Sequence, residues 1–207
     1  MSQRNTILRS LHDLGLAAWF GGALMGAVGL NGAARAEGET QTSTARIASS
    51  GWAKWTPVSA AAIGTHLIGG SGLLAANAAR VAGQQGVAAS TMAKTALTGA
   101  ALAATAYSRM LGKKIELASS TDPEDTEKAA KHPVGTDRAH RQLAFMQWAV
   151  PALTGGLLVL NALHGEQQRP EEQNRGMWQR AMSRTPHMPH MPMPAMASVP
   201  DWRWMQH

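Results

Sequence analysis

The sequence predicts an all-α fold: a four-helix transmembrane bundle followed by a disordered C-terminal tail. Three windows carry this prediction, because residues 14–34, 55–79 and 143–164 contain no Asp, Glu, Lys or Arg in a chain of which 15% is charged. An α-helix rises about 1.5 Å per residue, so about 20 residues cross the hydrocarbon core of a bilayer. Each window is long enough to do so, and polar stretches separate them. We therefore expect a multi-pass protein of a cell membrane, with the lipid bilayer as its main partner.

The first helix is expected over residues 11–34. Gly22 and Gly26 lie four residues apart and therefore share one helical face. Small residues at this spacing let another helix approach closely, so this face is the predicted contact for a neighbouring helix, a membrane protein partner or a second copy of the chain. A signal peptide is the alternative interpretation, with Arg4 and Arg9 before the apolar run. The run is longer than a typical signal sequence, which favours a retained helix.

The second helix is expected over residues 55–79, after a polar connection at 35–54. Trp52 and Trp55 flank a lysine directly before the apolar run. This pattern is typical of side chains that anchor a helix at the membrane surface. Pro57 falls in the expected first turn, where its missing N–H costs nothing.

The third helix, over residues 86–108, is the least apolar of the four. It is rich in Ala and Thr and contains Lys94 about a third of the way along. A lysine at the centre of a membrane helix costs about 2.5–3.5 kcal/mol on insertion scales, and Ala and Thr offset little of that. We expect this segment to cross the membrane inside the bundle; the alternative is that it lies across the other helices.

A second polar connection, 109–142, precedes the fourth helix at 143–164. Within the connection, Asp122 is followed by Pro123. Such a pair is typical of an N-cap followed by proline at the first helical position. The pair predicts a short surface helix over 122–131.

The transmembrane domain is expected to end at residue 165, and residues 166–207 are expected to form a flexible tail rich in Pro, Met and His. Five prolines between residues 186 and 200 forbid a continuous helix there. Imidazole and thioether groups are ligands that suit copper. The candidate metal ligands are His187, Met188, His190, Met191 and Met193. An inert linker is the alternative interpretation.

Composition and motifs exclude several classes of function. The chain has no cysteine, which rules out disulfides and thiolate metal sites. It contains no hydrolytic triad, phosphate-binding loop or dinucleotide-binding motif, which points away from an enzyme. The formal charge of +6 comes without a basic stripe carrying aromatic residues. We therefore interpret the charge as affinity for anionic lipid and expect no nucleic-acid partner.

His66 is the candidate for cofactor binding, because it lies near the middle of the second expected helix. An ionisable side chain is costly to place at that depth, so such a residue is a candidate for a functional role. A neutral imidazole can bind the iron of haem b, and His12 is the candidate for a second cofactor-binding residue. Counting residues from the expected helix ends places the two histidines at depths about 8–12 Å apart, too far for a matched pair. A histidine hydrogen-bonded to a neighbouring helix is the structural alternative.

The first helix resembles that of known bacterial membrane proteins. His12 followed by Trp19 and the pair Gly21-Gly22 is similar to the pattern in copper-resistance D-type proteins and in the membrane-bound protoporphyrinogen oxidase family. The chain as a whole resembles the small, Ala/Gly-rich, multi-helix membrane proteins of actinobacteria. That resemblance implies a bacterial membrane protein and no particular activity.

The sequence thus supports three functional hypotheses. The first is a non-enzymatic membrane protein that acts as a structural, accessory or assembly partner. The second is a membrane subunit that binds haem or quinone through His66. The third is a copper-handling membrane protein that uses the His/Met tail.

Overall fold

The computed structural model describes residues 5–83 and 85–167, and within these ranges the chain is helical with no β-strand, which confirms the all-α prediction. Residues up to His164 form one compact unit. In chain order the elements are α1 Thr6–Met25, the π-helical turn η1 Gly26–Leu30, α2 Asn31–Glu37, α3 Gln41–Ala76, α4 Ala78–Gly83, α5 Gln85–Ala118, α6 Pro123–Ala130 and α7 Thr136–Gln167.

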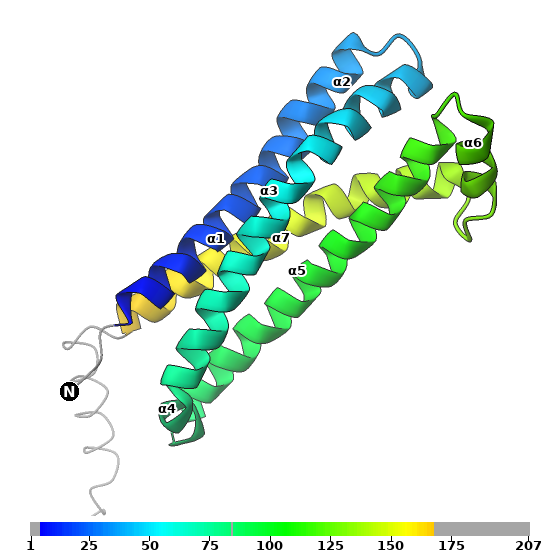
Figure 1. The fold of residues 1–207 in the computed structure, drawn as a ribbon. Helices are drawn as coiled ribbons and strands as arrows, with labels where there is room; N and C mark the ends of the chain where they lie inside the picture. The colour runs from blue at the N-terminus through cyan, green and yellow to red at the C-terminus, as the bar shows by residue number, and fades with distance from the viewer. Residues whose placement is uncertain (1–4, 84, 168–207) are drawn as a thin grey trace, which may run out of the picture. The chain divides into compact units, whose positions relative to one another are not determined.

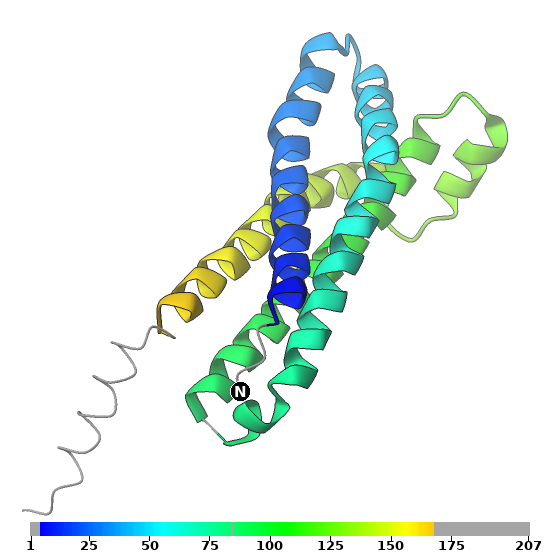
Figure 2. The ribbon, with the colours of Figure 1, turned by 60° about the vertical axis from the view of Figure 1, so that its left-hand side comes forward.

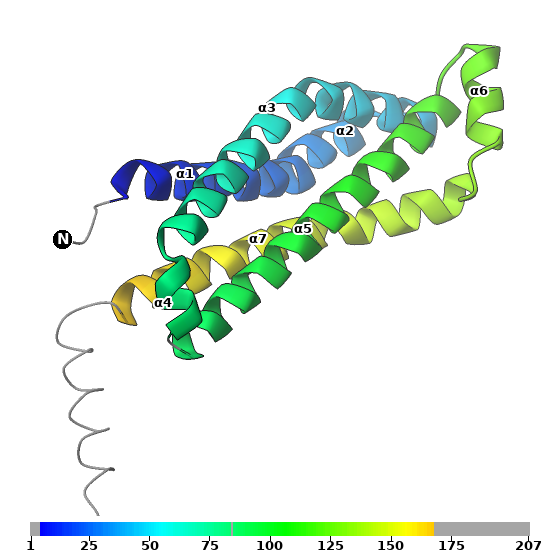
Figure 3. The same ribbon diagram turned by 60° about the horizontal axis from the view of Figure 1, so that its bottom comes forward.

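The long helices of this unit run alternately in opposite directions. α1, η1 and α2 form one continuous rod, and α3 returns beside it (Figure 1). α1 and α3 are the most closely packed pair and lie side by side in Figure 2 as well. The turn between α2 and α3 lies at the same end of the unit as α6, whereas α4 and the start of α1 lie at the other end (Figure 3).

α3 begins at Gln41, so most of the polar connection predicted at 35–54 is in fact helical. The cause is a capping box that starts the helix early. The hydroxyl of Thr40 accepts a hydrogen bond from the backbone N–H of Ser43 at 3.1 Å, and the hydroxyl of Ser43 accepts one from the N–H of Thr40 at 2.9 Å. The prediction that Pro57 lies in the first turn is therefore wrong, because Pro57 lies inside the helix.

Glycines let α1 and α3 approach almost to backbone contact. A Cβ atom added to Gly15 would lie 2.6 Å from the carbonyl oxygen of Ala62, and one added to Gly69 would lie 2.6 Å from the carbonyl oxygen of Leu8. Both distances are far below van der Waals contact, and the atoms met belong to a helix backbone that cannot swing away. The observed separation of the two helices therefore requires glycine at both positions.

The π-helical turn η1 changes which face of the first rod points inward. Gly22 and Gly26 are buried on the N-terminal side, and Asn31 and Ala34 are buried after the turn. A π-helical turn contains one residue more than an α-helical one, and one residue corresponds to about 100° of rotation. The extra residue therefore turns Asn31 toward the other helices.

Two clusters of buried side chains stabilise the unit. The first brings together α1, α3, α5 and α7 and consists of Leu16, Trp19, Ala62, Ala101, Ala104, Val150 and Leu157. The second lies toward α6 and consists of Ala45, Leu111, Ile115 and Ala139. The residues of the second cluster lie outside the windows that the sequence predicts to cross the membrane, so the helices stay packed beyond those windows.

The predicted short surface helix is present as α6. The Asp122 carboxylate accepts a hydrogen bond from the N–H of Glu124 at 2.9 Å, and proline occupies the first turn, as expected. Lys114 of α5 is buried, and its ammonium donates to the carbonyl of Ala129 in the last turn of α6. A cation at the C-terminus of a helix is favourable, so this contact holds α6 against α5.

Within the described part of the chain, three helical segments are long and apolar enough to cross a membrane: Thr6–Glu37, Gln41–Ala76 and Thr136–Leu163. The predicted third segment, 86–108, belongs to the continuous helix α5, which is not among these three. Helix length and apolarity thus give three candidate crossings, where the sequence predicts four. The tail predicted at 166–207 lies almost entirely outside the described residues.

Candidate functional site

Two histidines from different helices stack on each other where α1 and α3 meet. The centroids of the imidazole rings of His12 and His66 are 4.0 Å apart, and the ring planes are inclined by 21°. The expectation that the two side chains lie at different depths is therefore wrong. His66 is 1% exposed, whereas His12 is partly exposed.

Each ring of the histidine pair donates a hydrogen bond to the backbone of the opposite helix. Nδ1 of His12 lies 3.1 Å from the carbonyl oxygen of His66, and Nδ1 of His66 lies 2.9 Å from the carbonyl oxygen of His12. A carbonyl oxygen only accepts, so both Nδ1 atoms carry a proton, and in a neutral ring Nε2 then keeps its lone pair. This is the tautomer in which an imidazole can bind a metal or accept a proton through Nε2.

The crossing of α1 and α3 repeats one arrangement twice. Gly15 follows His12 by three residues, and Gly69 follows His66 by three residues. Each glycine lies against the backbone beside the other helix's histidine. The pattern His-x-x-Gly, present on both helices, is therefore the sequence signal that corresponds to the histidine pair.

Trp19 connects the histidine pair to α5. Its ring lies edge-on to that of His66, with 6.1 Å between centroids, and its Nε1 donates to the hydroxyl of Thr105 at 3.3 Å. The stacked rings of His12 and His66 leave no room for a porphyrin between them, so a haem would have to reach Nε2 of one ring from outside the stack. The haem hypothesis stays a prediction.

A cavity of about 370 Å³ lies between the α1–α3 pair and the helices α5 and α7. This volume is typical of small-molecule pockets, which occupy roughly 300–1,000 Å³. The lining extends from Trp19, beside the histidine pair, to Arg35 and Glu116, toward the turn between α2 and α3. His66 does not line the cavity, and Trp19 stands between the two features.

A chain of hydrogen bonds crosses one side of the cavity and joins α3, α2 and α7. The indole N–H of Trp52 donates to Oδ1 of Asn31 at 3.0 Å, and Nδ2 of Asn31 donates to Oε1 of Gln147 at 2.9 Å. Asn31 is buried, so both groups of its amide have a partner away from water. The sequence signal was an asparagine and a glutamine inside otherwise apolar windows.

Trp52 and Trp55 point into the unit, so the prediction that they anchor α3 at the membrane surface is wrong. The ring of Trp55 covers Gly22, and the ring of Trp52 covers Gly26. Both rings also line the cavity. The Gly22/Gly26 face predicted to receive a neighbouring helix is thus occupied by α3 of the same chain. Association with a second copy or another membrane protein stays a prediction.

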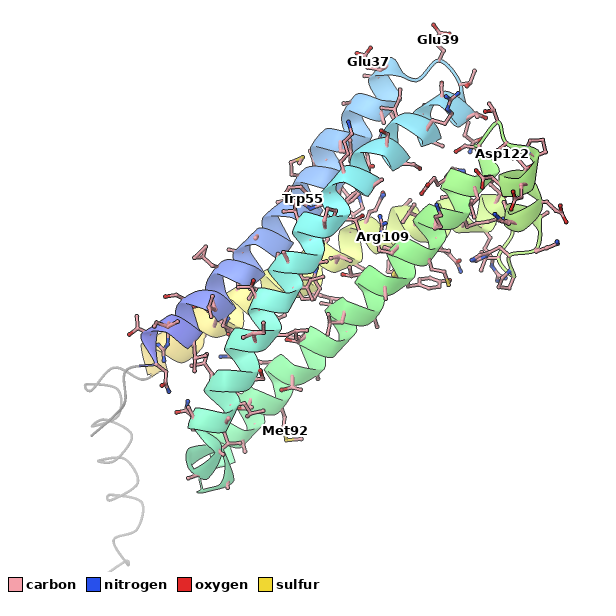
Figure 4. The ribbon with its side chains drawn as sticks, viewed as in Figure 1. Glu37, Glu39, Trp55, Met92, Arg109 and Asp122 are labelled. Carbon is pink, nitrogen blue, oxygen red and sulfur yellow. The ribbon has the colours of Figure 1, made fainter. Side chains whose placement is uncertain are left out.

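Arg109 lines the cavity from α5, facing the space that Trp55 lines from α3 (Figure 4). The hydroxyls nearby are already engaged: Ser108 donates to the carbonyl of Ala104, and Thr56 to that of Trp52, both at 2.8 Å. The cavity therefore combines aromatic walls with a guanidinium, and these hydroxyls are not poised as nucleophiles.

The candidate copper ligands of the tail, from His187 to Met193, lie outside the described residues, so copper binding stays a prediction. Among residues 5–83 and 85–167, no group of three or more His, Asp or Glu side chains is placed to hold a metal ion.

Comparisons with models of protein families, with curated proteins and with solved structures found no match. The similarity of the first helix to the copper-resistance D-type and protoporphyrinogen oxidase families therefore stays a prediction.

Proposed function

We propose that this chain is a multi-pass integral membrane protein that acts by binding, as a non-enzymatic accessory or assembly component. The observation that carries the proposal is the apolar outer surface of the long helices. In the three apolar segments, protein covers only 33%, 17% and 22% of the most hydrophobic window. Large side chains such as Ile68, Phe145 and Val159 are exposed there. In water this surface would be strongly unfavourable, whereas lipid chains cover it without cost.

We propose further that α5 is the fourth crossing. It contributes Ala101 and Ala104 to the first buried cluster, so it packs among the three apolar helices. Lys94 is only partly exposed, and its cost of about 2.5–3.5 kcal/mol applies to a lysine on a lipid-exposed helix centre. Four crossings also place both polar connections on one side of the membrane and the turn between α4 and α5 on the other.

The polar side chains around the cavity support a binding role, because they form hydrogen bonds with one another. The amides of Asn31 and Gln147 bond to each other and to Trp52, and Thr105 accepts from Trp19. These side chains stabilise the walls of the cavity, whereas a catalytic site needs a nucleophile or acid held beside its activating partner.

The topology is tested by single-cysteine labelling, which the chain favours because it has no native cysteine. Glu39→Cys, Glu124→Cys and Ala82→Cys place one thiol in each exposed connection. An impermeant thiol reagent should label the first two from one side of the membrane and Ala82→Cys only from the other. Labelling of Glu124→Cys on the side of Ala82→Cys would mean that α5 does not cross. Recovery of the wild-type chain in the soluble fraction would refute a membrane protein altogether.

The second candidate function is a haem- or quinone-binding subunit. The observation that favours it is the histidine pair, in which hydrogen bonds fix the tautomer that leaves Nε2 free. The test is the absorption spectrum of the protein purified in detergent after expression with added haem. A Soret band that disappears in His66→Ala supports haem ligation, and the absence of a Soret band in the wild type rules it out.

A further inference from the structure

The cavity offers both apolar and cationic side chains, as an amphipathic ligand requires. Its lining combines apolar side chains, among them Trp19, Trp55, Ile63 and Val150, with the two arginines Arg35 and Arg109. The indole N–H groups of Trp19 and Trp52 donate to protein acceptors, so these residues offer ring surface to a ligand. The apolar side chains suit a hydrocarbon chain, and the arginines suit an acidic group.

The cavity lining contains two arginines and one carboxylate, Glu116, so its arginines are in excess. Within the described residues, neither Arg35 nor Arg109 forms an ion pair with a carboxylate. Glu116 also lines the cavity, but its carboxylate lies 2.8 Å from the ammonium of Lys113. Two guanidinium groups therefore remain for an anion, and guanidinium is the side chain that binds phosphate most readily by paired hydrogen bonds.

The two arginines also lie where lipid phosphates lie, if the topology proposed above holds. Arg35 directly follows the uncharged window 14–34, and Arg109 directly follows the segment 86–108. These helices run in the same direction, so both arginines leave the hydrocarbon on the same side of the membrane. The end of the cavity at Trp19 then points toward the bilayer interior.

We infer that the cavity is a binding site for an acidic phospholipid, with its phosphate at Arg35 and Arg109 and an acyl chain along Trp19 and Trp55. A neutral lipid leaves the net positive charge of the site unbalanced, and inorganic phosphate leaves the apolar side chains uncovered. The inference rests on the proposed membrane topology and adds a ligand class to the proposed binding role.

The test is native mass spectrometry of the full chain in detergent, with phosphatidylglycerol and phosphatidylcholine carrying identical acyl chains. Both lipids carry the phosphate, but the choline cation offsets its charge in phosphatidylcholine, so the net positive lining predicts about tenfold tighter binding of phosphatidylglycerol. The double variant Arg35→Gln/Arg109→Gln should abolish this preference. The control Arg46→Gln/Arg141→Gln removes the same charge from α3 and α7 outside the cavity lining and should keep it.

A second pair of variants locates the lipid. Ala48→Phe fills the cavity without changing charge and should lower phosphatidylglycerol binding several-fold, whereas Ala61→Phe, on the exposed surface of α3, should not. Equal affinity for the two lipids, or equal losses in both arginine double variants, would refute the site. Inorganic phosphate that binds as tightly as phosphatidylglycerol in the same measurement would also refute a lipid ligand. Because the cysteine labelling measures topology independently, a correct topology with no lipid preference would overturn this inference alone.

Discussion

Replacing Gly69 with alanine should separate α1 from α3 and break the histidine pair. The added Cβ atom would lie 2.6 Å from the carbonyl oxygen of Leu8, and an ordinary contact needs about 3.5 Å, so the helices must move apart by about 1 Å. The hydrogen bonds of 3.1 and 2.9 Å between the pair then lengthen to about 4 Å and are lost. Overpacking costs about 1–3 kcal/mol and each lost bond about 0.5–1.5 kcal/mol, which gives about 2–6 kcal/mol in total.

Gly64→Ala is the matched control on the same helix. Nothing lies within 4 Å of the Cβ atom it adds, so it gains the higher helix propensity of alanine without a clash. The free energy of unfolding is measured by SDS titration from mild-detergent micelles, followed by loss of helical circular dichroism. Gly69→Ala should unfold at a lower SDS concentration than Gly64→Ala, and its free energy of unfolding should be lower by about 2–6 kcal/mol. Equal stability of the two variants would refute the close approach of α1 and α3 on which the histidine pair depends.

Three further substitutions test other contacts by the same unfolding measurement. Asn31→Leu should lower stability by about 1–3 kcal/mol because it leaves buried polar groups of Trp52 and Gln147 without a partner; unchanged stability would contradict the hydrogen-bond chain. His66→Phe keeps a ring but loses one cross-helix bond, so we expect a loss of about 0.5–1.5 kcal/mol, smaller than that of Gly69→Ala. Thr40→Ala should cost about 1 kcal/mol by removing the cap of α3, and a stability equal to wild type would mean that the capping box does not start the helix.

Hydrophobic windows and capping signals predicted much of the helical architecture. Each uncharged window lies largely within α3, within α7 or within the continuous rod of α1, η1 and α2, and Asp122-Pro123 marks the start of α6. These features follow from local chemistry, because a cap or an apolar run acts on its own segment. They do not determine how far a helix continues into polar sequence, which is why α3 starts well before its window.

The histidine pair was missed because its register depends on the turn between the helices. α2 ends at Glu37 and α3 begins at Gln41, so the hairpin is centred on Glu39. In an antiparallel pair centred there, residue numbers that face each other sum to about 78, and 12 plus 66 is 78. Measuring depth from the ends of the apolar windows instead assumed a long, non-helical connection. Because the connection is mostly helical, this register places His12 opposite His66.

The inward position of the tryptophans could not be predicted from their neighbours along the chain. Trp52 and Trp55 beside a lysine have the local pattern of a surface anchor, yet each covers a glycine of the preceding helix. Only the pairing of α1 with α3 brings Gly22 and Gly26 opposite them. Arg109 was recognisable as the end of an uncharged stretch, but its place in a cavity depends on four separate segments of the chain.

Because the first helical rod contains the π-helical turn Gly26–Leu30, the number of residues in the rod determines which of its side chains contact the other helices. Losing any one residue of the turn would restore a regular α-helix and swing everything after it by about 100°. Asn31 would then face away from Trp52 and Gln147, and Arg35 would leave the cavity, although no side chain had been substituted. Within this short stretch, a one-residue deletion should therefore be more damaging than most point mutations, and homologues shorter by one residue here should lack both the polar chain and the contribution of Arg35 to the cavity.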